Sequence, residues 1–389
     1  MEKLINITGK ALSGEWGIDD EEGIGISVLR TTNFTNDGII DYSNVITRTI
    51  TKKNIADKFL RKGDIIIEKS GGSDNQPVGR VVYFDNDENK YLFNNFTGLL
   101  RVKDTTKWLP KYIFYSLFAN YQSGGTRRYE NKTTGLHNLQ TDFYVKDFEI
   151  KETSYSEQIE ICELFDKITD LIDKRKQQLE KLDELVKSRF IEMFGDCDLT
   201  AQKKEWKAVR EVGTVVGGST PKTSVAGYWN GEYRWLSPAE LEQDSGVIFD
   251  SAKKITKAGI ESCSLQELPV GTVILSSRAP IGKLAIAGNT FYCNQGFKNI
   301  VCSERVVPRY LYSLLLFNTE YLNSLGRGAT FKEISKSIVE NIKIPVPPIK
   351  LQNQFADFVE QIDKSKFEIK QSLEKLELLK KALMQKYFG

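Results

Sequence analysis

Residues 155–195 read YSEQIEICELFDKITDLIDKRKQQLEKLDELVKSRFIEMFG, and residues 349–389 read IKLQNQFADFVEQIDKSKFEIKQSLEKLELLKKALMQKYFG. The two stretches align without a gap, so that Gln158 meets Gln352 and the string LEKL stands at the same place in both. Apolar residues recur in each stretch at steps of three and four, which is the pattern of a helix with one apolar face. Two long and similar helices are therefore expected.

Each expected helix needs a partner. About 40 helical residues span roughly 60 Å, which is more than a small domain can bury, and a lone helix with an exposed apolar stripe is unstable in water. Burying a large apolar side chain contributes about 1.5–3 kcal/mol, so the two apolar faces favour pairing with each other. The first helix leads into residues 196–348 and the second helix leaves them, so the second runs back along the first. We expect an antiparallel coiled coil.

The repeat extends into the segments that precede the helices, because matching strings occur there in the same order in both halves of the chain. They are Gly63-Asp64-Ile65-Ile66 with Gly271-Thr272-Val273-Ile274, Pro77-Val78-Gly79 with Pro280-Ile281-Gly282, Asn94 with Asn294, and Pro110-Lys111-Tyr112-Ile113 with Pro308-Arg309-Tyr310-Leu311. The expected fold class is α+β with a pseudo-twofold internal repeat. Its four parts are a first domain at 1–154, a helix at 155–195, a second domain at 196–348 and a helix at 349–389.

Composition excludes several classes of protein. The net charge of +2 means that any affinity for nucleic acid has to come from local basic clusters. The five cysteines are scattered, which is typical of reduced thiols in a cytoplasmic protein. The sequence lacks both the run of about 20 apolar residues that a membrane helix needs and a secretory signal at its N-terminus. We expect a cytoplasmic protein that does not enter a membrane.

Three strings in the second half, and a fourth that leads into the second helix, carry a family resemblance. GGSTPK at 217–222 is followed by YWNG at 228–231 and RWLSP at 234–238, and PVPPI at 345–349 leads into the second helix. Together with the order domain, helix, domain, helix, these strings resemble the specificity (S) subunit of type I restriction–modification enzymes over essentially the whole chain. The first domain departs from the pattern, because it has SGEWG at 13–17 in place of GGSTPK and no proline pair before its helix.

The resemblance implies a function in DNA recognition. Two target-recognition domains would each recognise one half of a split, asymmetric target in double-stranded DNA through the major groove. The coiled coil would set the unread spacer and bind two modification (M) subunits, and restriction (R) subunits would join the complex. Those partners would hold S-adenosylmethionine, ATP and Mg, whereas this chain would bind no cofactor and no metal.

DNA recognition requires basic groups at the phosphates and polar side chains at the base edges. Glycines beside such residues, at 71–72, 124–125, 326 and 328, suggest exposed loops. The favoured clusters are Arg127-Arg128 with Lys132 and Arg327 with Lys332, because they fall at comparable places in the repeat. The full set of expected DNA-binding residues is Arg30, Asn33, Lys69, Ser70, Arg80, Arg127, Arg128, Tyr129, Lys132, Thr220, Lys222, Tyr228, Arg234, Arg278, Asn294, Gln295, Arg327 and Lys332.

The sequence offers little for catalysis. His137 is the only histidine, and we expect it in a polar loop or at DNA. Gly282-Lys283 is followed by Leu284, which does not fit a phosphate-binding loop, and no Asn-Pro-Pro-aromatic methyltransferase string occurs. A non-catalytic DNA-recognition subunit is the expected function. The alternative is a scaffold that does not bind DNA and uses the coiled coil to present two protein-binding domains.

Overall fold

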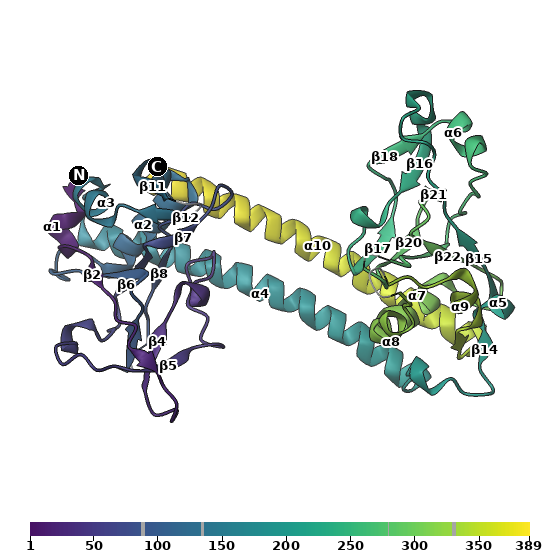
Figure 1. The fold of residues 1–389 in the computed structure, drawn as a ribbon, viewed down its shortest axis with the longest axis horizontal. Helices are drawn as coiled ribbons and strands as arrows, with labels where there is room; N and C mark the ends of the chain where they lie inside the picture. The colour runs from purple at the N-terminus through teal and green to yellow at the C-terminus, as the bar shows by residue number, and fades with distance from the viewer. Residues whose placement is uncertain (87–89, 134–135, 279, 329–331) are drawn as a thin grey trace. The chain divides into compact units, whose positions relative to one another are not determined.

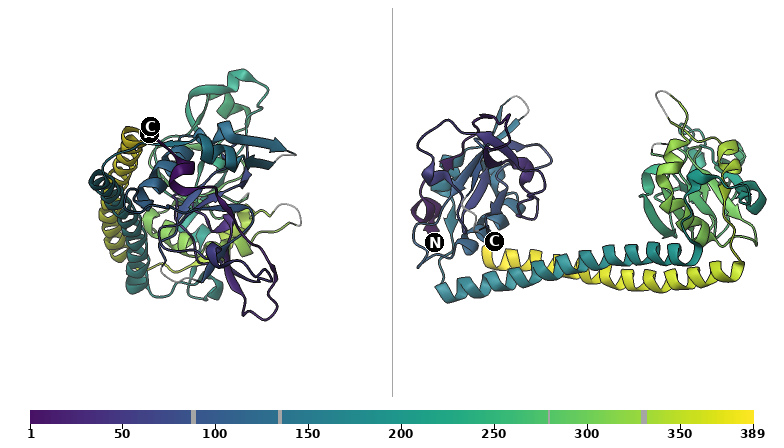
Figure 2. Two further views of the ribbon diagram at one scale, coloured as in Figure 1. Left: turned by 90° about the vertical axis from the view of Figure 1, so that its left-hand side faces the viewer. Right: turned by 90° about the horizontal axis from the view of Figure 1, so that it is seen from below.

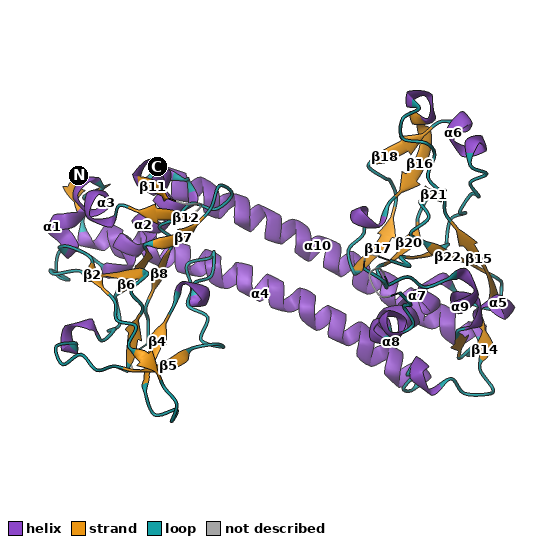
Figure 3. Cartoon of the chain, viewed as in Figure 1, coloured by secondary structure: helices purple, strands orange, loops and turns teal. Residues whose placement is uncertain are grey.

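The computed structural model describes residues 1–86, 90–133, 136–278, 280–328 and 332–389 (Figure 1). The chain divides into two compact units, which we call unit 1 (Met1–Lys176 with Gln371–Gly389) and unit 2 (Gln177–Lys370). Helices and strands are mixed in both units, as expected of an α+β fold (Figure 3). The long helices α4 (Tyr155–Phe194) and α10 (Ile349–Phe388) each begin in one unit and end in the other.

The main sheet has the same strand order in both units. In unit 1 the order is β2 (Leu12–Ser13), β10 (Thr97–Leu100), β6 (Ile65–Glu68) and β8 (Val81–Tyr83). In unit 2 it is β15 (Gly213–Gly217), β22 (Lys298–Cys302), β19 (Val273–Leu275) and β20 (Leu284–Ala287), with β17 (Asp244–Ile248) added at the edge. The pairs within each set of four strands are antiparallel. The shared order confirms the repeat predicted from the sequence.

A second sheet repeats as well. In unit 1 its order is β3 (Ile18–Asp19), β5 (Ile46–Thr49), β4 (Ile26–Leu29) and β9 (Tyr91–Phe93). In unit 2 its order is β18 (Lys253–Ile255), β16 (Trp229–Leu236) and β21 (Tyr292–Cys293). The pair β4–β9 is parallel, and so is its counterpart β16–β21. The parallel strands end at the same edge, and the loops that follow β9 and β21 leave from there.

Short elements complete both units in the same way. The pair β1 (Glu2–Lys3) with β13 (Glu149–Ile150) has its counterpart in β14 (Lys207–Ala208) with β23 (Lys343–Ile344). Helices α1 (Leu4–Thr8), α2 (Pro110–Gln122) and α3 (Thr141–Asp147) correspond to α5 (Val209–Val212), α7 (Pro308–Phe317) and α9 (Lys336–Asn341). Unit 1 also has a sheet of β11 (Glu130–Thr133), β12 (Leu136–Leu139) and β7 (Ser70–Gly72), and unit 2 has helices α6 (Lys257–Ser262) and α8 (Thr319–Ser324).

The long helices pack against each other in an antiparallel sense within each unit. In unit 1 the ring of Phe165, near the start of α4, lies 5.8 Å from that of Phe388 at the end of α10. In unit 2 the ring of Phe190, near the end of α4, lies 5.3 Å from that of Phe355 near the start of α10. The ribbons of α4 and α10 are seen side by side in Figure 2. The antiparallel coiled coil predicted from the apolar repeat is confirmed.

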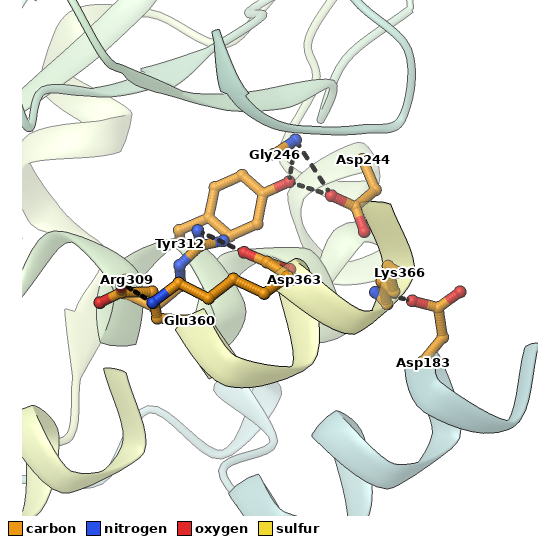
Figure 4. Close-up of polar contacts among 9 residues, drawn as sticks. Asp183, Asp244, Gly246, Arg309, Tyr312, Glu360, Asp363 and Lys366 are labelled. Carbon is orange, nitrogen blue, oxygen red and sulfur yellow. Dashed lines mark hydrogen bonds and ion pairs between the residues drawn. The ribbon is translucent and has the colours of Figure 1, made fainter. Parts of the chain in front are cut away.

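Helix α10 is fixed to unit 2 by polar contacts around α7 (Figure 4). The Arg309 guanidinium lies 2.8 Å from the Asp363 carboxylate on α10, and Lys366 of α10 forms an ion pair with Asp183 of α4. On the other side of α7, the hydroxyl of Tyr312 donates to Asp244 and accepts the backbone N–H of Gly246. These contacts join α7 to α10 and to the edge strand β17, and they join α10 to α4.

Two sequence predictions about unit 1 are wrong. The glycines at 71–72 do not form an exposed loop, because they belong to strand β7, and Gly72 is buried beside Val78 and His137. His137 is not in a polar loop but in β12, where it is 4% exposed and its Nδ1 lies 2.9 Å from a carboxylate oxygen of Glu130. A buried acid within hydrogen-bond distance satisfies the imidazole inside the protein.

Among the described helices, none combines the length and the apolarity that crossing a membrane requires.

Candidate nucleic-acid interface

The candidate interface is built around two equivalent loops, which follow β9 in unit 1 and β21 in unit 2. The backbone N–H of Asn94 donates to the Leu29 carbonyl at 2.9 Å, and that of Asn294 donates to the Leu236 carbonyl at 3.0 Å. Each loop is crossed by the segment that follows β2 in unit 1 or β15 in unit 2. In unit 1 the Glu15 N–H donates to the Phe93 carbonyl at 2.8 Å, and in unit 2 the Ser219 N–H donates to the Cys293 carbonyl at 2.9 Å. The two loops therefore have the same backbone setting.

A glycine is required at each crossing. A Cβ atom on Gly14 would lie 2.1 Å from the Asn94 carbonyl oxygen, and one on Gly218 would lie 2.0 Å from that of Asn294. Such distances are far inside van der Waals contact, so only glycine permits this approach. The string SGEWG at 13–17 is thus the structural counterpart of GGSTPK at 217–222, although the two differ in sequence.

The tryptophans of unit 2 explain why its three strings occur together. The Trp235 indole N–H donates to the Ser219 carbonyl at 3.1 Å, and that of Trp229 donates to the Lys222 carbonyl at 3.3 Å. The two rings pack edge to face at 5.1 Å. The two rings therefore hold the segment from Ser219 to Lys222 in place beside the loop after β21.

Polar side chains of unit 2 gather around its loop. Gln295 is exposed and accepts a hydrogen bond from the Thr220 hydroxyl. The Lys298 ammonium donates to the Gln295 carbonyl at 3.3 Å and lies 3.2 Å from the Glu333 carboxylate. Arg327 pairs with Glu333 through two backbone hydrogen bonds of 3.1 and 3.0 Å. The structure thus brings Thr220 and Gln295 into contact and connects them through Lys298 to the strand pair of Arg327 and Glu333, which the sequence alone could not show.

Further predicted residues lie at the same surface of unit 2. Arg278 forms an isolated bridge with Glu333, and its Nε and the Asn294 side-chain oxygen both lie beside Gly296. Lys332 is exposed, and its Cβ is next to Gly326. Exposed cations beside amide and hydroxyl groups can contact phosphates and base edges together, so this surface is suited to a nucleic acid.

Unit 1 has a different surface around the equivalent loop. Lys69 lies beneath it, with its N–H donating to the Phe96 carbonyl at 2.8 Å and its ammonium donating to the Ser13 hydroxyl at 2.9 Å. Burial, and secondarily the charge of nearby Lys58, lower the pKa of Lys69. The Phe96 ring projects from the loop and is 53% exposed. Ser70, another predicted residue, is half-buried opposite Asn138 in strand β7.

The two favoured basic clusters do not match residue for residue. The N–H of Leu139 donates to the Lys69 carbonyl at 2.8 Å, and the N–H of Ile334 donates to the Ser277 carbonyl at 3.0 Å. Leu139 and Ile334 are therefore equivalent, and so are the residues before them, Asn138 and Glu333. The residue paired with Asn138 thus corresponds to the residue paired with Glu333. That residue is Asn131 in unit 1 and Arg327 in unit 2. Arg127 and Arg128 precede this position in a short 3-10 helix, and both are exposed. Lys132 lies in β11, but its side chain lies outside the described part of the chain.

Four predicted residues of unit 1 have structural roles. Arg80 donates to the carbonyls of Phe34 and Thr31 at 2.8 and 3.0 Å and to the buried Glu68 at 3.0 Å. Lys283 of unit 2 has a similar role, because its ammonium donates to the Pro238 carbonyl at 3.1 Å. Asn33 is 2% exposed, and its side-chain amide donates to the carbonyls of Asp41 and Asn44. Arg30 also donates to the Asn44 carbonyl. Tyr129 is 1% exposed, and its hydroxyl donates to the Asp147 carboxylate.

Other predicted residues of unit 2 lie on or beside β16. The Arg234 guanidinium forms an ion pair with Asp250 at 3.2 Å, so this cation is already partnered. Tyr228 is half-buried, and its carbonyl accepts the N–H of Thr256 at 3.0 Å. Lys222 is fully at the surface and remains a candidate for phosphate contact.

Sequence analysis missed Lys298 and Phe96, which the structure places at the two loops. The signal was present, since each follows one of the repeated asparagines, Asn294 and Asn94, by a few residues. Among the described residues, no group of three or more His, Cys, Asp or Glu side chains is arranged to hold a metal ion.

Comparison with known proteins gives one family. Residues 3–184 and 203–380 match the profile of the type I restriction modification DNA specificity domain, which therefore occurs twice in the chain. The chain is 37% identical to the type I restriction enzyme MjaIX specificity subunit of Methanocaldococcus jannaschii over 184 residues, which are 46% of this chain and 43% of that relative. It is 24% identical to the MjaX specificity subunit of the same organism over 94% of this chain and 87% of that relative.

A solved structure shows the same fold. The S subunit of a type I restriction–modification system from M. genitalium superimposes with a TM-score of 0.58 over 100% of this chain and 95% of that chain, at 15% identity.

Proposed function

The chain belongs to the family of type I restriction–modification specificity subunits, and from that premise we propose that its two units each recognise one half of a bipartite, asymmetric DNA target. The observation that carries the proposal is the contrast between the loops after β9 and β21. Their backbones have the same hydrogen-bonded setting, whereas the exposed side chains around them differ, with Phe96 in unit 1 and Gln295 in unit 2. Two units with the same backbone arrangement and different surface side chains suit a DNA target whose two halves differ in sequence.

Local charge supports binding to double-stranded DNA. The net charge of the chain is only +2, but cations gather beside the loop of unit 2, where Arg327, Lys332 and Lys222 are exposed. Arg127 and Arg128 are exposed in unit 1. Cations of this kind neutralise phosphates and hold a protein in register, while neighbouring polar groups contact the bases.

The helix pair would set the distance between the two half-sites. Helices α4 and α10 have 40 residues each, so each spans roughly 60 Å at 1.5 Å per residue. A paired, continuous helix is stiff enough to act as a spacer, and its length would fix the number of base pairs left unread between the half-sites.

Exposed apolar side chains on the helices support the binding of two modification (M) subunits. In unit 1, Leu171 of α4 and Leu378 of α10 are 45% and 69% exposed. In unit 2, Leu185 of α4 and Phe367 of α10 are 46% and 62% exposed. Exposed apolar side chains on both helices in each unit would suit one M subunit per unit. Restriction (R) subunits would join this complex. This chain would be non-catalytic, and the partners would bind S-adenosylmethionine, ATP and Mg.

The spacer role can be tested by lengthening the helices. One heptad inserted after Lys176 in α4 and one after Lys370 in α10 would add about 10 Å to both, which corresponds to about three base pairs of DNA at 3.4 Å each. Selection of bound sequences from a random DNA pool, using the complex with the M subunit, is expected to give the same two half-sites with a gap about three base pairs longer. An unchanged gap contradicts the proposal. An insertion in α4 alone breaks the pairing and serves as the control.

A further inference from the structure

The loops Asn94–Phe96 and Asn294–Gly296 have one backbone arrangement and different side chains. Phe96 and Gly296 accept equivalent hydrogen bonds from the N–H groups of Lys69 and Ser277, both at 2.8 Å. The strand that follows each loop is in the same register, since Thr97 lies opposite Glu68 and Phe297 opposite Ser276. The residue pairs 95 with 295 and 96 with 296 are therefore equivalent positions.

The fold does not need the side chains that point outward at these positions. Gly296 occupies the place of Phe96 and has no side chain, yet the surrounding hydrogen bonds are kept in both units. The Phe96 ring is 53% exposed, and Gln295 is exposed as well. Because Gly296 shows that the fold does not require this ring, the exposed ring of Phe96 is free to contact another molecule.

Each side chain has a preferred partner among the DNA bases. In the major groove, a glutamine amide makes paired hydrogen bonds with N6 and N7 of adenine, whereas an apolar side chain contacts the C5-methyl group of thymine. The Gln295 side-chain oxygen already accepts the Thr220 hydroxyl, and this restrains the amide while a second lone pair and the NH₂ group stay available. Phe96 has no polar atom on its side chain and can offer only its ring.

From these loops, and resting on the proposed function, we infer that Phe96 and Gln295, at neighbouring positions of two equivalent loops, are specificity-determining residues for the two half-sites. Gln295 selects an adenine in the half-site of unit 2 through N6 and N7. Phe96 selects a thymine in the half-site of unit 1 through its methyl group. The asymmetry of the target thus arises partly from the loop position that holds Phe96 in unit 1 and Gly296, which has no side chain, in unit 2.

The test uses the complex of the full chain with its M subunit and a pool of random double-stranded DNA. Phe96→Ala and Gln295→Ala are each other's controls, because each is expected to relax one base position in a different half-site and leave the other half-site unchanged. Discrimination at the relaxed position is expected to fall roughly 10-fold or more. Retention of the other half-site shows that the variant is folded and assembled.

Base analogues then test the atoms involved. Deoxyuridine lacks the thymine methyl group, so replacing the selected thymine by it is expected to weaken wild-type binding severalfold and to leave Phe96→Ala unaffected. 7-Deazaadenine lacks N7 and is expected to weaken the wild type but not Gln295→Ala. If each variant responds to its analogue as the wild type does, or keeps both half-sites unchanged, the inference is overturned while the proposed function stands. A wild-type complex that selects no two-part sequence overturns the proposed function itself.

Discussion

The side-chain oxygen of Gln352 accepts the backbone N–H of Val307 at 2.8 Å, and its amide group donates to the carbonyls of Arg305 and Pro347 at 3.1 and 2.8 Å. Gln158 of unit 1 makes the same three kinds of contact, with Leu109, Lys107 and Thr153. In each unit this glutamine connects the first turn of the long helix to the turn that precedes α2 or α7. Its side-chain oxygen accepts a backbone N–H that has no partner within the short helix.

Loss of this contact is expected to destabilise unit 2. Gln352 is fully buried, so Gln352→Ala leaves an N–H and two carbonyls without partners, at a cost of about 2–4 kcal/mol. Urea unfolding measures the loss, and hydrogen exchange of peptides covering 303–311 locates it. Gln354→Ala, at an exposed position of the same helix, is expected to change stability by less than about 0.5 kcal/mol. Equal effects of the two substitutions would contradict this account.

Two neighbouring glycines give a matched pair for the loop of unit 2. Gly218→Ala places a Cβ 2.0 Å from the Asn294 carbonyl oxygen, whereas a Cβ on Gly217 meets nothing within 4 Å. Gly218→Ala is expected to displace the loop, cost about 1–3 kcal/mol and abolish recognition of one half-site, while Gly217→Ala keeps it. Sequence selection with the two complexes checks this. Intact recognition by Gly218→Ala would show that the loop setting does not matter for recognition.

Salt dependence tests the phosphate contacts. Arg327→Ala removes an exposed cation opposite Glu333 and is expected to weaken binding to all sequences and to lower the slope of log affinity against log salt by about 0.9. Arg305 is exposed on the turn before α7, so Arg305→Ala is expected to leave the slope unchanged. Titrations at several salt concentrations compare them, and identical slopes for wild type and Arg327→Ala would exclude Arg327 from phosphate contact.

Thiol reactivity follows from burial. Desolvation raises the pKa of Cys162, Cys293 and Cys302 to about 12, and only the thiolate reacts with alkylating reagents. At pH 8 roughly one such thiol in 10,000 is ionised, and this fraction rises tenfold for each pH unit. Mass spectrometry after brief alkylation at pH 8 is therefore expected to find these three unmodified in the folded chain and modified in guanidinium. Rapid modification of Cys293 in the folded chain would contradict its buried position.

The long helices and the repeat could be predicted because their signals are local. The apolar steps in 155–195 and 349–389 define each helix face, and Gln158 with Gln352 stood out by alignment because both meet the same structural need. The strand order within the units could not be obtained this way, since it depends on contacts between segments far apart in the chain.

The candidate site was less predictable, because sequence does not show which polar groups are already partnered. Tyr129 and Asn33 were predicted to contact DNA, but Asp147 and Asp41 satisfy their polar groups inside unit 1. The sequence does not show that Arg80 forms an ion pair with the buried Glu68, so from the sequence alone Arg80 is expected to be an unpaired cation. Conversely, the position of Phe96 shortly after the repeated Asn94 was visible in the sequence, but its exposure was not, since exposure depends on what packs around the ring.

The most direct test of the central claim is to map DNA methylation in a host that expresses this chain with its M subunit, and in the same host without the chain. Single-molecule sequencing reports the methylated positions. A two-part motif with unlike halves and one fixed gap, present only when the chain is expressed, is the predicted result. A stable complex that leaves the methylation pattern unchanged, or a motif that persists without the chain, would contradict it.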